Sequence, residues 1–511
     1  MAKRFPTFKP YNQHQIMMLP PSLDELIVKD HPVRVVNAVI DSINIDPLLS
    51  SYQSIGCSSY HPQMLLKVLI YGYVTNVYSS RKLEVACKEN INFMWLSAMN
   101  YPDHNTINRF RGVRLKEALR TIFEQVVKLL VKEGLISIEE LYTDGTKIEA
   151  NANKYTFVWK KSIQTNKEKM KKQLAEIWTY AQTVADKEDS LPDPPDFTTI
   201  NAEKVKETVE KLNSVLTKNK QASNKAKAKM RYISKNFVEQ IKKYEHQEDI
   251  LGERNSYSKT DPQATFMMMK EDHMQNGQLK PGYNVQISTS NQYIVNYTIH
   301  SNPTDTRTLK SHLEQFEKSY GINPTSITAD AGYGSEENYD LLQQRNIKPF
   351  VKYNMFDTQQ HQATSDKTPF SVEKLFYQKE HDSYVCPMGQ DMRYIGSIIK
   401  RTSTGYEQRI KRYQAQCCSN CPLNGKCHKS KGNRTIEVNE NLNRHRFKAF
   451  TLLNSEEGKE KRKKRCFDVE PVFGNIKNNH KFKRFMLRGK EKVEIEWGLL
   501  AIAQNIRKKS A

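Results

Sequence analysis

Three acidic residues that lie far apart in the chain occur in settings that would let their side chains meet. Asp144 lies in LYTDGTKIEA and Asp330 in SITADAGYGS, each after an apolar, β-prone run and before a glycine. Glu470 lies in FDVEPVFGNIK, where a helix could begin. A carboxylate at the end of a strand, beside a permissive glycine turn, is well placed to project into a shared site. Three such groups can hold two divalent cations about 3.5–4 Å apart, which activates water or a hydroxyl group against a phosphodiester.

The basic residues around Glu470 strengthen this interpretation, because an Asp in a DG or DAGYG string is by itself an ordinary turn residue. Lys477 follows Glu470 by two helical turns and would lie near the same helix face, where it could grip the phosphate at the scissile bond. Arg465 precedes Glu470 by five residues and could reach the same strand. The alternative for both is ordinary surface charge. Asp261 is a competing carboxylate, but its SKTDP context favours a turn.

The composition indicates a polyanionic partner. The chain has 511 residues with 79 Lys and Arg against 57 Asp and Glu, a net charge of +22. The positive electrostatic field of such a chain favours binding of nucleic acid. Together with the three carboxylates, this charge indicates chemistry on DNA strands. A merely soluble basic protein is the alternative. The sequence contains no apolar run that could span a membrane and no apolar signal-peptide core at its start, so we expect a cytosolic protein.

The spacing of the cysteines predicts a structural zinc site. In a reducing compartment the eight cysteines should be free or metal-bound rather than paired in disulfides. Two of them stand in the Cys-x2-Cys spacing of a zinc knuckle, and a four-thiolate site is closed to water and therefore not catalytic. Free thiols in a loop are the alternative, and Cys417 or His428 could replace a neighbouring ligand. The predicted ligands are Cys386, Cys418, Cys421 and Cys427.

The first part of the chain has the apolar periodicity of helices. Ser22 can cap a first helix, with Glu25 completing a capping box, and Pro62 stands near the start of another helix in HPQMLLKVLIYGYV. Several short helices with basic turns suit binding in a DNA groove, although a helical bundle with a solvated basic face is the alternative. The residues that we expect to contact DNA here are Arg81, Arg109 and Arg111.

The pattern in the rest of the chain predicts a mixed α/β unit that carries two inserted segments. LISIEELYTDGTKIEA predicts a strand that ends at Asp144, and residues 282–300 predict two strands with a turn at Ser290-Asn291. A helix, a strand that delivers Asp330, a second helix and a further strand follow. The lysine-rich stretch predicts an antiparallel hairpin of two helices, separated by the break LPDPPDF. The cysteine-bearing stretch that comes before the Glu470 helix looks polar and irregular.

The chain is too long for one ordinary core, so we expect several structural units. They are a helical DNA-binding domain (1–134), a first core part (135–160), a helical insertion (161–255), a second core part (256–356), a cysteine-rich insertion (357–464) and C-terminal core helices (465–511).

These motifs resemble those of a known family. The strings DGT, ADAGYG and VEPVFGNIK, the last with its lysine, are similar to the catalytic motifs of DDE transposases from bacterial insertion sequences. The segments YHPQMLLKVLIYGYV and PDHNTINRFR resemble the helical domain that precedes the core in that family, and GYNVQ resembles the stretch between its two aspartates. The resemblance covers the chain nearly from end to end.

The resemblance implies an α/β fold with an RNase H-like mixed sheet and flanking helices. It also implies two Mg²⁺ or Mn²⁺ ions, cleavage of DNA at element ends and transfer of the 3′-OH strand to target DNA. Asp144, Asp330 and Glu470 would take the acidic roles and Lys477 that of the lysine. The family has a tyrosine–arginine pair before the glutamate. No tyrosine occurs near that position here, so Arg465 matches only part of the pair.

Because transposition joins two element ends, we expect a homodimer or larger assembly on DNA, acting at the bacterial nucleoid. A non-catalytic DNA-binding protein or repressor derived from such an enzyme is one alternative, and metal-dependent nicking would distinguish the two. A hydrolytic nuclease with the same core is another, and strand-transfer products would exclude it.

Overall fold

The computed structural model describes residues 22–50, 52, 59–184, 195–218, 222–269, 277–360 and 369–511. The chain divides into two compact units. One comprises the described residues up to Val126 together with Leu499–Ala511, and the other comprises Val127–Gly498. Most of the break LPDPPDF lies outside the described residues. Within the described part, no helix is long and apolar enough to cross a membrane.

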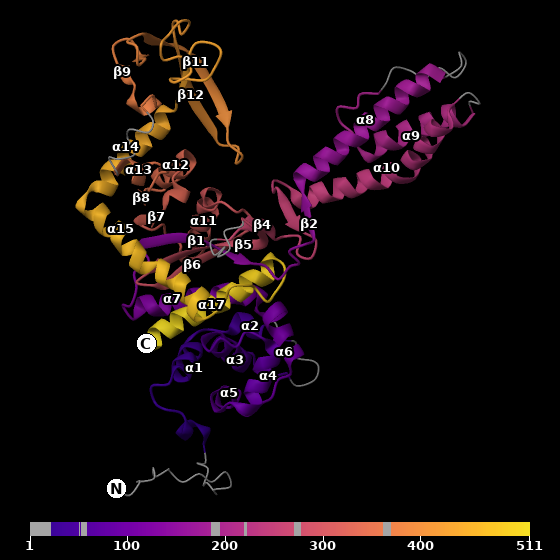
Figure 1. The fold of residues 1–511 in the computed structure, drawn as a ribbon. Coiled ribbons are helices and arrows are strands. Elements are labelled where there is room, and N and C mark those ends of the chain that lie inside the picture. The colour runs from indigo at the N-terminus through magenta and orange to yellow at the C-terminus, as the bar shows by residue number, and fades with distance from the viewer. Residues whose placement is uncertain are drawn as a thin grey trace, which may run out of the picture. The chain divides into compact units, whose positions relative to one another are not determined.

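The first unit is helical, as the periodicity predicts (Figure 1). The helix that was predicted to start at Ser22 is a single 3₁₀ turn. The Ser22 hydroxyl accepts a hydrogen bond from the amide of Asp24, and that turn ends at Leu26. A new helix begins at Pro32, and His31 before it is extended, as expected of a residue that precedes proline. The elements are η1 (Leu23–Leu26), α1 (Pro32–Ser42), α2 (Asp46–Leu49), α3 (Pro62–Val74), α4 (Ser80–Glu89), α5 (Ile91–Leu96), α6 (His104–Arg109), the π-helical turn η2 (Phe110–Arg114) and the start of α7 (Leu115–Lys132).

Helix α3 forms the centre of the first unit because it is apolar around nearly its whole circumference and almost every side chain is buried. Its C-terminal carbonyls are capped from far along the chain. Arg507, near the end of α17 (Lys490–Ser510), donates to the carbonyls of Val74 and Tyr73 and to the side-chain oxygen of Asn76. The last turns of the chain therefore complete the helical unit.

The second unit contains a mixed sheet. Its strands lie in the order β4–β5–β1–β7–β8, with β6 also paired to β5. The pairs β1–β5 and β5–β6 are antiparallel, whereas β1–β7 and β7–β8 are parallel, which gives the predicted mixed α/β order. The elements are β1 (Glu140–Glu149), β4 (Thr265–Met268), β5 (Leu279–Ser290), β6 (Tyr293–His300), η3 (Asp305–Arg307), α11 (Leu309–Tyr320), β7 (Ser326–Ala329), η4 (Ala331–Tyr333), α12 (Glu336–Gln344), β8 (Lys348–Val351) and α13 (Phe356–Gln360).

The hairpin of β5 and β6 is present, and its turn lies one residue later than predicted. Asn291 and Gln292 have φ angles of 51° and 65°. Two positive φ angles in a two-residue loop match the right-handed twist of the flanking strands. The hairpin is important for the site because β5 pairs with β1 along most of its length.

The prediction that a strand ends at Asp144 was wrong, because β1 runs on to Glu149. Asp144 lies opposite Ile287 and Gly145 opposite Gln286 in the antiparallel pairing with β5. A Cβ atom on Gly145 would lie 2.6 Å from Asp305 Oδ1 and closer still to Gln286 Nε2. Because Gly145 has no side chain, the side chains of Gln286 and Asp305 can approach the strand closely at this position. The glycine does not form a turn.

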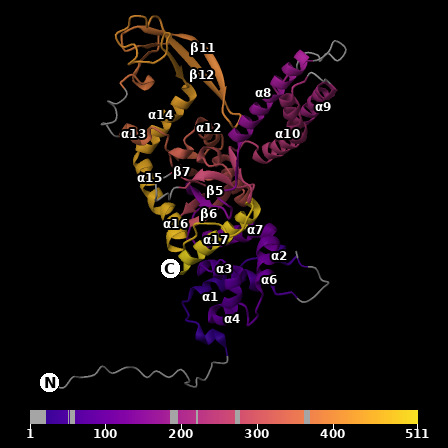
Figure 2. The same ribbon diagram turned by 45° about the vertical axis from the view of Figure 1, so that its right-hand side comes forward.

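The lysine-rich stretch forms three helices, one more than predicted. They are α8 (Lys160–Val184), α9 (Ala202–Lys218) and α10 (Asn224–Leu251), and Figures 1 and 2 show them side by side. They enclose an apolar cluster of their own that includes Leu174, Trp178 and Phe237. Short strands β2 (Phe157–Trp159) and β3 (Ser256–Ser258) pair at the base of the bundle.

The cysteine-bearing stretch, predicted to be irregular, instead forms a second sheet with strand order β13–β12–β11–β10–β9. Its apolar cluster is small, and β11 is largely exposed on both faces, so the sequence lacks the alternation that marks a half-buried strand. The elements are η6 (Val372–Lys374), β9 (Phe376–Gln378), β10 (Ser383–Val385), β11 (Asp391–Arg401), β12 (Glu407–Ala415), β13 (Thr435–Val438), α14 (Glu440–Asn454), α15 (Glu456–Asp468), α16 (Glu470–Gly474) and the π-helical turn η7 (Asn475–Asn479).

His300, the last residue of β6, should make stability depend on pH. Burial, and then the Lys490 ammonium group, lower the pKa of His300 to about 4, against the opposing effect of Asp305. In the unfolded chain a histidine titrates near pH 6.5, so the unfolded state binds more protons and stability falls as the pH drops from about 6.5 towards 4. At pH 5 this loss is about 2 kcal/mol. Urea unfolding at pH 7 and pH 5 should show this loss of stability in the wild type and not in His300→Gln. An equal loss in both proteins would contradict the attribution of the pH dependence to His300.

Candidate active site

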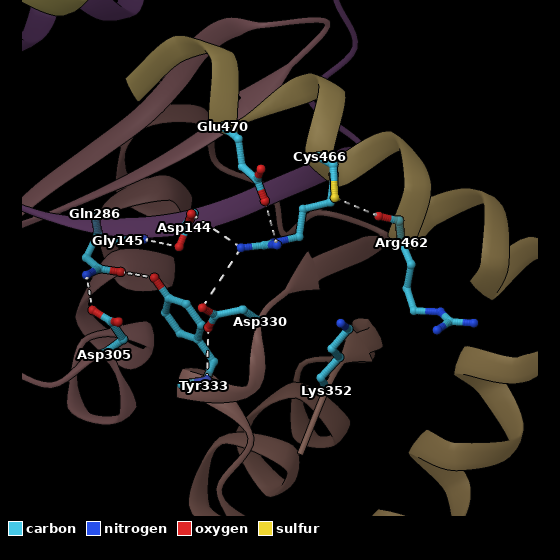
Figure 3. Close-up of polar contacts among 12 residues, drawn as sticks. Asp144, Gly145, Gln286, Asp305, Asp330, Tyr333, Lys352, Arg462, Cys466 and Glu470 are labelled. Carbon is cyan, nitrogen blue, oxygen red and sulfur yellow. Dashed lines mark hydrogen bonds and ion pairs between the residues drawn. The ribbon is translucent and has the colours of Figure 1, made fainter. Parts of the chain in front are cut away.

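One open pocket on the second unit gathers the three acids. Asp144 comes from the middle of β1, Asp330 directly follows β7 and Glu470 begins α16. Figure 3 shows the three side chains facing one another. Because β1 and β7 are parallel neighbours in the sheet, the two aspartates meet at adjacent strands. The pocket is lined by Asp144, Thr146, Asp330, Arg465, Glu470, Phe473, Gly474, Lys477 and Asn478.

Backbone amides orient both aspartates. Asp144 is buried, and its Oδ1 accepts the N–H of Gly145 at 2.8 Å. Asp330 caps η4, accepting the N–H of Gly332 at 2.9 Å. Glu470 is the most open of the three acids, with 54% of its side chain exposed. The pocket therefore has a fixed acidic floor and a carboxylate at its solvent side.

The guanidinium group of Arg465 lies between the acids. Its Nη2 is 3.3 Å from Asp144 Oδ2 and 3.9 Å from Asp330 Oδ2, and its Nη1 is 3.5 Å from Glu470 Oε1. Arg465 was predicted to reach a DNA strand. In this structure its guanidinium group is the positive charge among the three acids.

The donor set of the pocket suits magnesium chemically, but it is not arranged as a metal site. Among the residues that the structure describes, no three His, Cys, Asp or Glu side chains are grouped so that they could hold an ion. The guanidinium group of Arg465 lies among the acids, with both aspartates at its Nη2 and Glu470 at its Nη1. The side chains available are oxygen donors, with Thr146 and Asn478 beside the carboxylates, as Mg²⁺ prefers.

A buried hydrogen-bond network lies next to the aspartates and was not predicted from the sequence. The Tyr333 hydroxyl donates to Gln286 Oε1, and Gln286 Nε2 donates to Asp305 Oδ1 (Figure 3). Asn284 Nδ2 donates to the same oxygen of Asp305. Burial, followed by the carboxylates of Asp305, Asp144 and Asp330, raises the pKa of Tyr333 well above its usual value. Tyr333 therefore stays a neutral donor that braces the turn after Asp330.

A signal for this network exists in the sequence. Asn284, Gln286 and Ser288 alternate along β5 and are all buried. Polar side chains on a buried strand face must find partners, so their spacing marks a polar network inside the sheet. The partner Asp305 lies in η3, outside any regular pattern, and could not be paired with them from the sequence.

The helix that carries Glu470 is fixed to the sheet by Asp468. This buried carboxylate accepts the Thr289 hydroxyl at 2.6 Å and the amide of Gln292 at 3.1 Å. The π-helical turn η7 then brings Lys477 into the pocket lining, where it is 8% exposed. Glu470 and Lys477 thus face one pocket, as their spacing predicts.

The basic residues predicted in the first unit differ in their surroundings. Arg81 on α4 and Arg109 on α6 are exposed. Arg111 is only 3% exposed, and it donates to the carbonyl of Tyr78 at 2.8 Å and to Asn108 Oδ1 at 3.0 Å. The donors of Arg111 thus hold the connection between α3 and α4, a structural role that differs from the predicted DNA contact.

Asp261, the competing carboxylate, lies outside the pocket lining. It is buried and accepts hydrogen bonds from the Tyr283 hydroxyl at 2.9 Å and from the amide of Gly489 at 3.3 Å. Its surroundings are those of a structural residue, in agreement with the turn that its sequence context favours.

The predicted zinc ligands line one small cavity in the second sheet. All described cysteines are free thiols. Cys386 accepts the amide of Gln390 at 3.3 Å, Cys418 accepts the amide of Arg434 at 3.3 Å, and Cys427 accepts Arg434 Nη1 at 2.8 Å. As with the acids, these described side chains are not grouped as metal ligands. The cavity lining includes Cys386, Cys417, Cys418, Cys421, Cys427, His428 and Arg434.

Two stretches of the chain, one in the helical unit and one in its last quarter, match family models of transposase domains. Residues 385–509 match the family described as transposase DDE domain, and residues 21–112 match the family described as transposase domain (DUF772). The two matches indicate a DDE transposase of the insertion-sequence kind, a family that generally uses divalent metal ions. Comparison with curated proteins and with solved structures gives no match.

The matched regions cover only part of the site. Glu470, Lys477 and Arg465 lie inside the DDE match, whereas Asp144 and Asp330 lie before it. The roles of these two aspartates therefore depend on their sequence motifs and on their position beside Glu470 in the pocket.

Proposed function

We propose that the chain binds the DNA ends of its element, cleaves them and transfers the 3′-OH strand to target DNA by two-metal transesterification. The observation that supports this most is the pocket in which Asp144, Asp330 and Glu470 stand together with Lys477. Asp144 and Asp330 lie 186 residues apart in the sequence and Asp330 and Glu470 lie 140 apart, and a structural role for each acid alone would not require one shared pocket.

We also propose that the sheet is an RNase H-like core. In support, the strand order β6–β5–β1–β7–β8 begins with three antiparallel strands and continues with two strands parallel to β1. The bundle α8–α10 and the sheet β9–β13 would then be insertions, since each has an apolar cluster of its own.

In this proposal Asp144, Asp330 and Glu470 would hold two Mg²⁺ or Mn²⁺ ions. Bound there, the ions would supply charge neutralisation at the phosphate and activation of the attacking oxygen. The protein contributes the positions of the acids. The Gly145 amide fixes Asp144, the η4 turn fixes Asp330, and Asp468 fixes the helix of Glu470.

Lys477 would bind a non-bridging oxygen of the scissile phosphate. Lys477 as a whole is only 8% exposed, so its attraction for a phosphate should be stronger than that of a lysine on the surface. Thr146 and Asn478 line the same pocket and could donate hydrogen bonds to the DNA backbone.

We propose that exposed basic residues of the helical unit, among them Arg81 and Arg109, contact DNA phosphates. The net charge of +22 supports a polyanionic partner. Joining two element ends requires two active sites, so a homodimer or larger assembly on chromosomal DNA in the cytoplasm belongs to the same proposal.

We further propose one structural Zn²⁺ held by Cys386, Cys418, Cys421 and Cys427, because these thiols line one cavity and have zinc-knuckle spacing. Arg434 would have to release Cys427. We expect about one zinc per chain by elemental analysis and a lower melting temperature after chelation, with Cys421→Ser reproducing the loss. A protein that contains no zinc and whose melting temperature does not change with chelator would contradict the proposed zinc site.

The experiment that tests the proposed function uses the purified chain, Mg²⁺, linear DNA that carries an end of the element, and a supercoiled plasmid as target. We expect cleavage at the element end and covalent joining of that end to the plasmid. Cleavage without joining would indicate a hydrolytic nuclease, and binding without cleavage would indicate a non-catalytic DNA-binding protein. Either result would contradict the proposal.

A further inference from the structure

Arg465 has unusual ion pairs for a nearly buried arginine. Only 14% of its side chain is exposed, yet its contacts to Asp144, Asp330 and Glu470 are 3.3, 3.9 and 3.5 Å long. Charge-assisted hydrogen bonds are normally about 2.7–2.9 Å long. The guanidinium group is therefore shared loosely among three carboxylates instead of being committed to one of them.

A second observation supports this loose binding. Arg465 Nε is buried and has no hydrogen-bond partner among the described residues. A buried donor without a partner is costly, so this position of the side chain is held mainly by attraction to the acids. The Nε of Arg111 also lacks a partner, but both terminal nitrogens of Arg111 donate to protein oxygens at 2.8 and 3.0 Å, whereas those of Arg465 are 3.3–3.9 Å from the acids.

The charges explain why a cation must occupy this place. Three ionised carboxylates that face one pocket repel one another, and each disfavours ionisation of the others. Arg465 contacts all three and offsets part of that repulsion. A divalent cation would do the same more strongly, and it would need the same carboxylate oxygens.

We propose that Arg465 is a positioning residue that holds the three acids together until metal binds and that metal binding then displaces its guanidinium group. This inference rests on the proposed function, because it assumes that these acids bind the metal. The displacement needs only rotation of the side chain, since Asp468 fixes the end of α15 to the β5–β6 hairpin. The released guanidinium stays beside the pocket, where its planar donors suit a phosphate.

The affinity of the pocket for metal distinguishes displacement of the Arg465 guanidinium group from a merely structural role of Arg465. Mn²⁺ binding to the full-length chain is measured by the electron paramagnetic resonance signal of free Mn²⁺. Because Arg465→Gln removes the competing cation, we expect it to bind Mn²⁺ at least about tenfold more tightly than the wild type. Its melting temperature should fall without metal and recover with Mn²⁺.

Lys463→Gln is the matched control, because it removes one positive charge from an exposed position of the same helix. It should leave Mn²⁺ affinity within about twofold of the wild type, as expected of a screened surface charge. Unchanged or weaker Mn²⁺ binding by Arg465→Gln would overturn the inference but not the proposed function. A wild type that binds no Mn²⁺ in this pocket would overturn both.

A measurement on the wild type avoids any folding defect of the variant. Phenylglyoxal modifies accessible arginines, and mass spectrometry reports the modified peptide. Arg465 should react slowly without metal and several-fold faster when Mn²⁺ is added, while the exposed Arg109 serves as internal reference. Reactivity of Arg465 that is unchanged or reduced by Mn²⁺ would overturn the displacement.

Discussion

Asp144→Asn, Asp330→Asn and Glu470→Gln are each expected to lower Mg²⁺-dependent strand cleavage by more than about 100-fold. Loss of an outer partner of a metal ligand already costs about 10–100-fold, so loss of a direct ligand should cost more. Each change keeps the size of the side chain and removes only its charge. DNA binding through the basic surfaces should therefore persist, and cleavage alone should fail.

Single-turnover cleavage and filter binding on the same DNA separate these two effects. Glu460→Gln is the matched control, since Glu460 is exposed on α15 and absent from the pocket lining. It should cleave at the wild-type rate. If all three acid variants kept Mg²⁺-dependent cleavage near that rate, the pocket would not be the catalytic site.

Gly334→Ala is expected to displace the turn that presents Asp330. A Cβ atom on Gly334 would lie 2.8 Å from the Cα atom of Tyr353 and closer still to the carbonyl oxygen of Lys352, both of which are backbone atoms after β8. Neither can rotate away, so the turn itself must move. We expect a loss of about 1–3 kcal/mol in stability and a loss of cleavage of more than tenfold, since a misplacement of about 1 Å can cost up to 10²-fold.

Urea unfolding and the cleavage assay measure the two effects of Gly334→Ala. Gly112→Ala is the control, because nothing lies within 4 Å of the position that its Cβ would take. The control lies within a helical segment and should therefore be at least as stable as the wild type, and it should cleave at the wild-type rate. Wild-type stability and cleavage in Gly334→Ala would contradict the fixed position that the structure gives to the Asp330 turn.

The local settings of Asp330 and Glu470 were predictable, but that of Asp144 was not. ADAGYG marks the end of a strand and a turn, and both are present around Asp330. DGT looks equally like a turn, yet β1 continues through it because residues of β5, far along the chain, pair with it. Gly145 could end a strand, or it could lie within one and leave room for the side chains of Gln286 and Asp305. The pairing of β1 with β5 decides between the two, and a local sequence pattern does not reveal that pairing.

Other features escaped prediction for related reasons. The sheet of β9–β13 buries so few side chains that its strands carry no clear apolar alternation. Arg111 looks like a surface charge until the fold places the carbonyl of Tyr78 beside it. Arg465 could be placed near Glu470 from the sequence, but its contacts with both aspartates depend on how α15 packs across the sheet.

The most direct test of the paired-cation site is anomalous diffraction from crystals of the full chain soaked in Mn²⁺. We predict two anomalous peaks about 3.5–4 Å apart, within ligand distance of Asp144, Asp330 and Glu470. Mn²⁺ bound only elsewhere, or no peak in this pocket at millimolar Mn²⁺, would contradict the account.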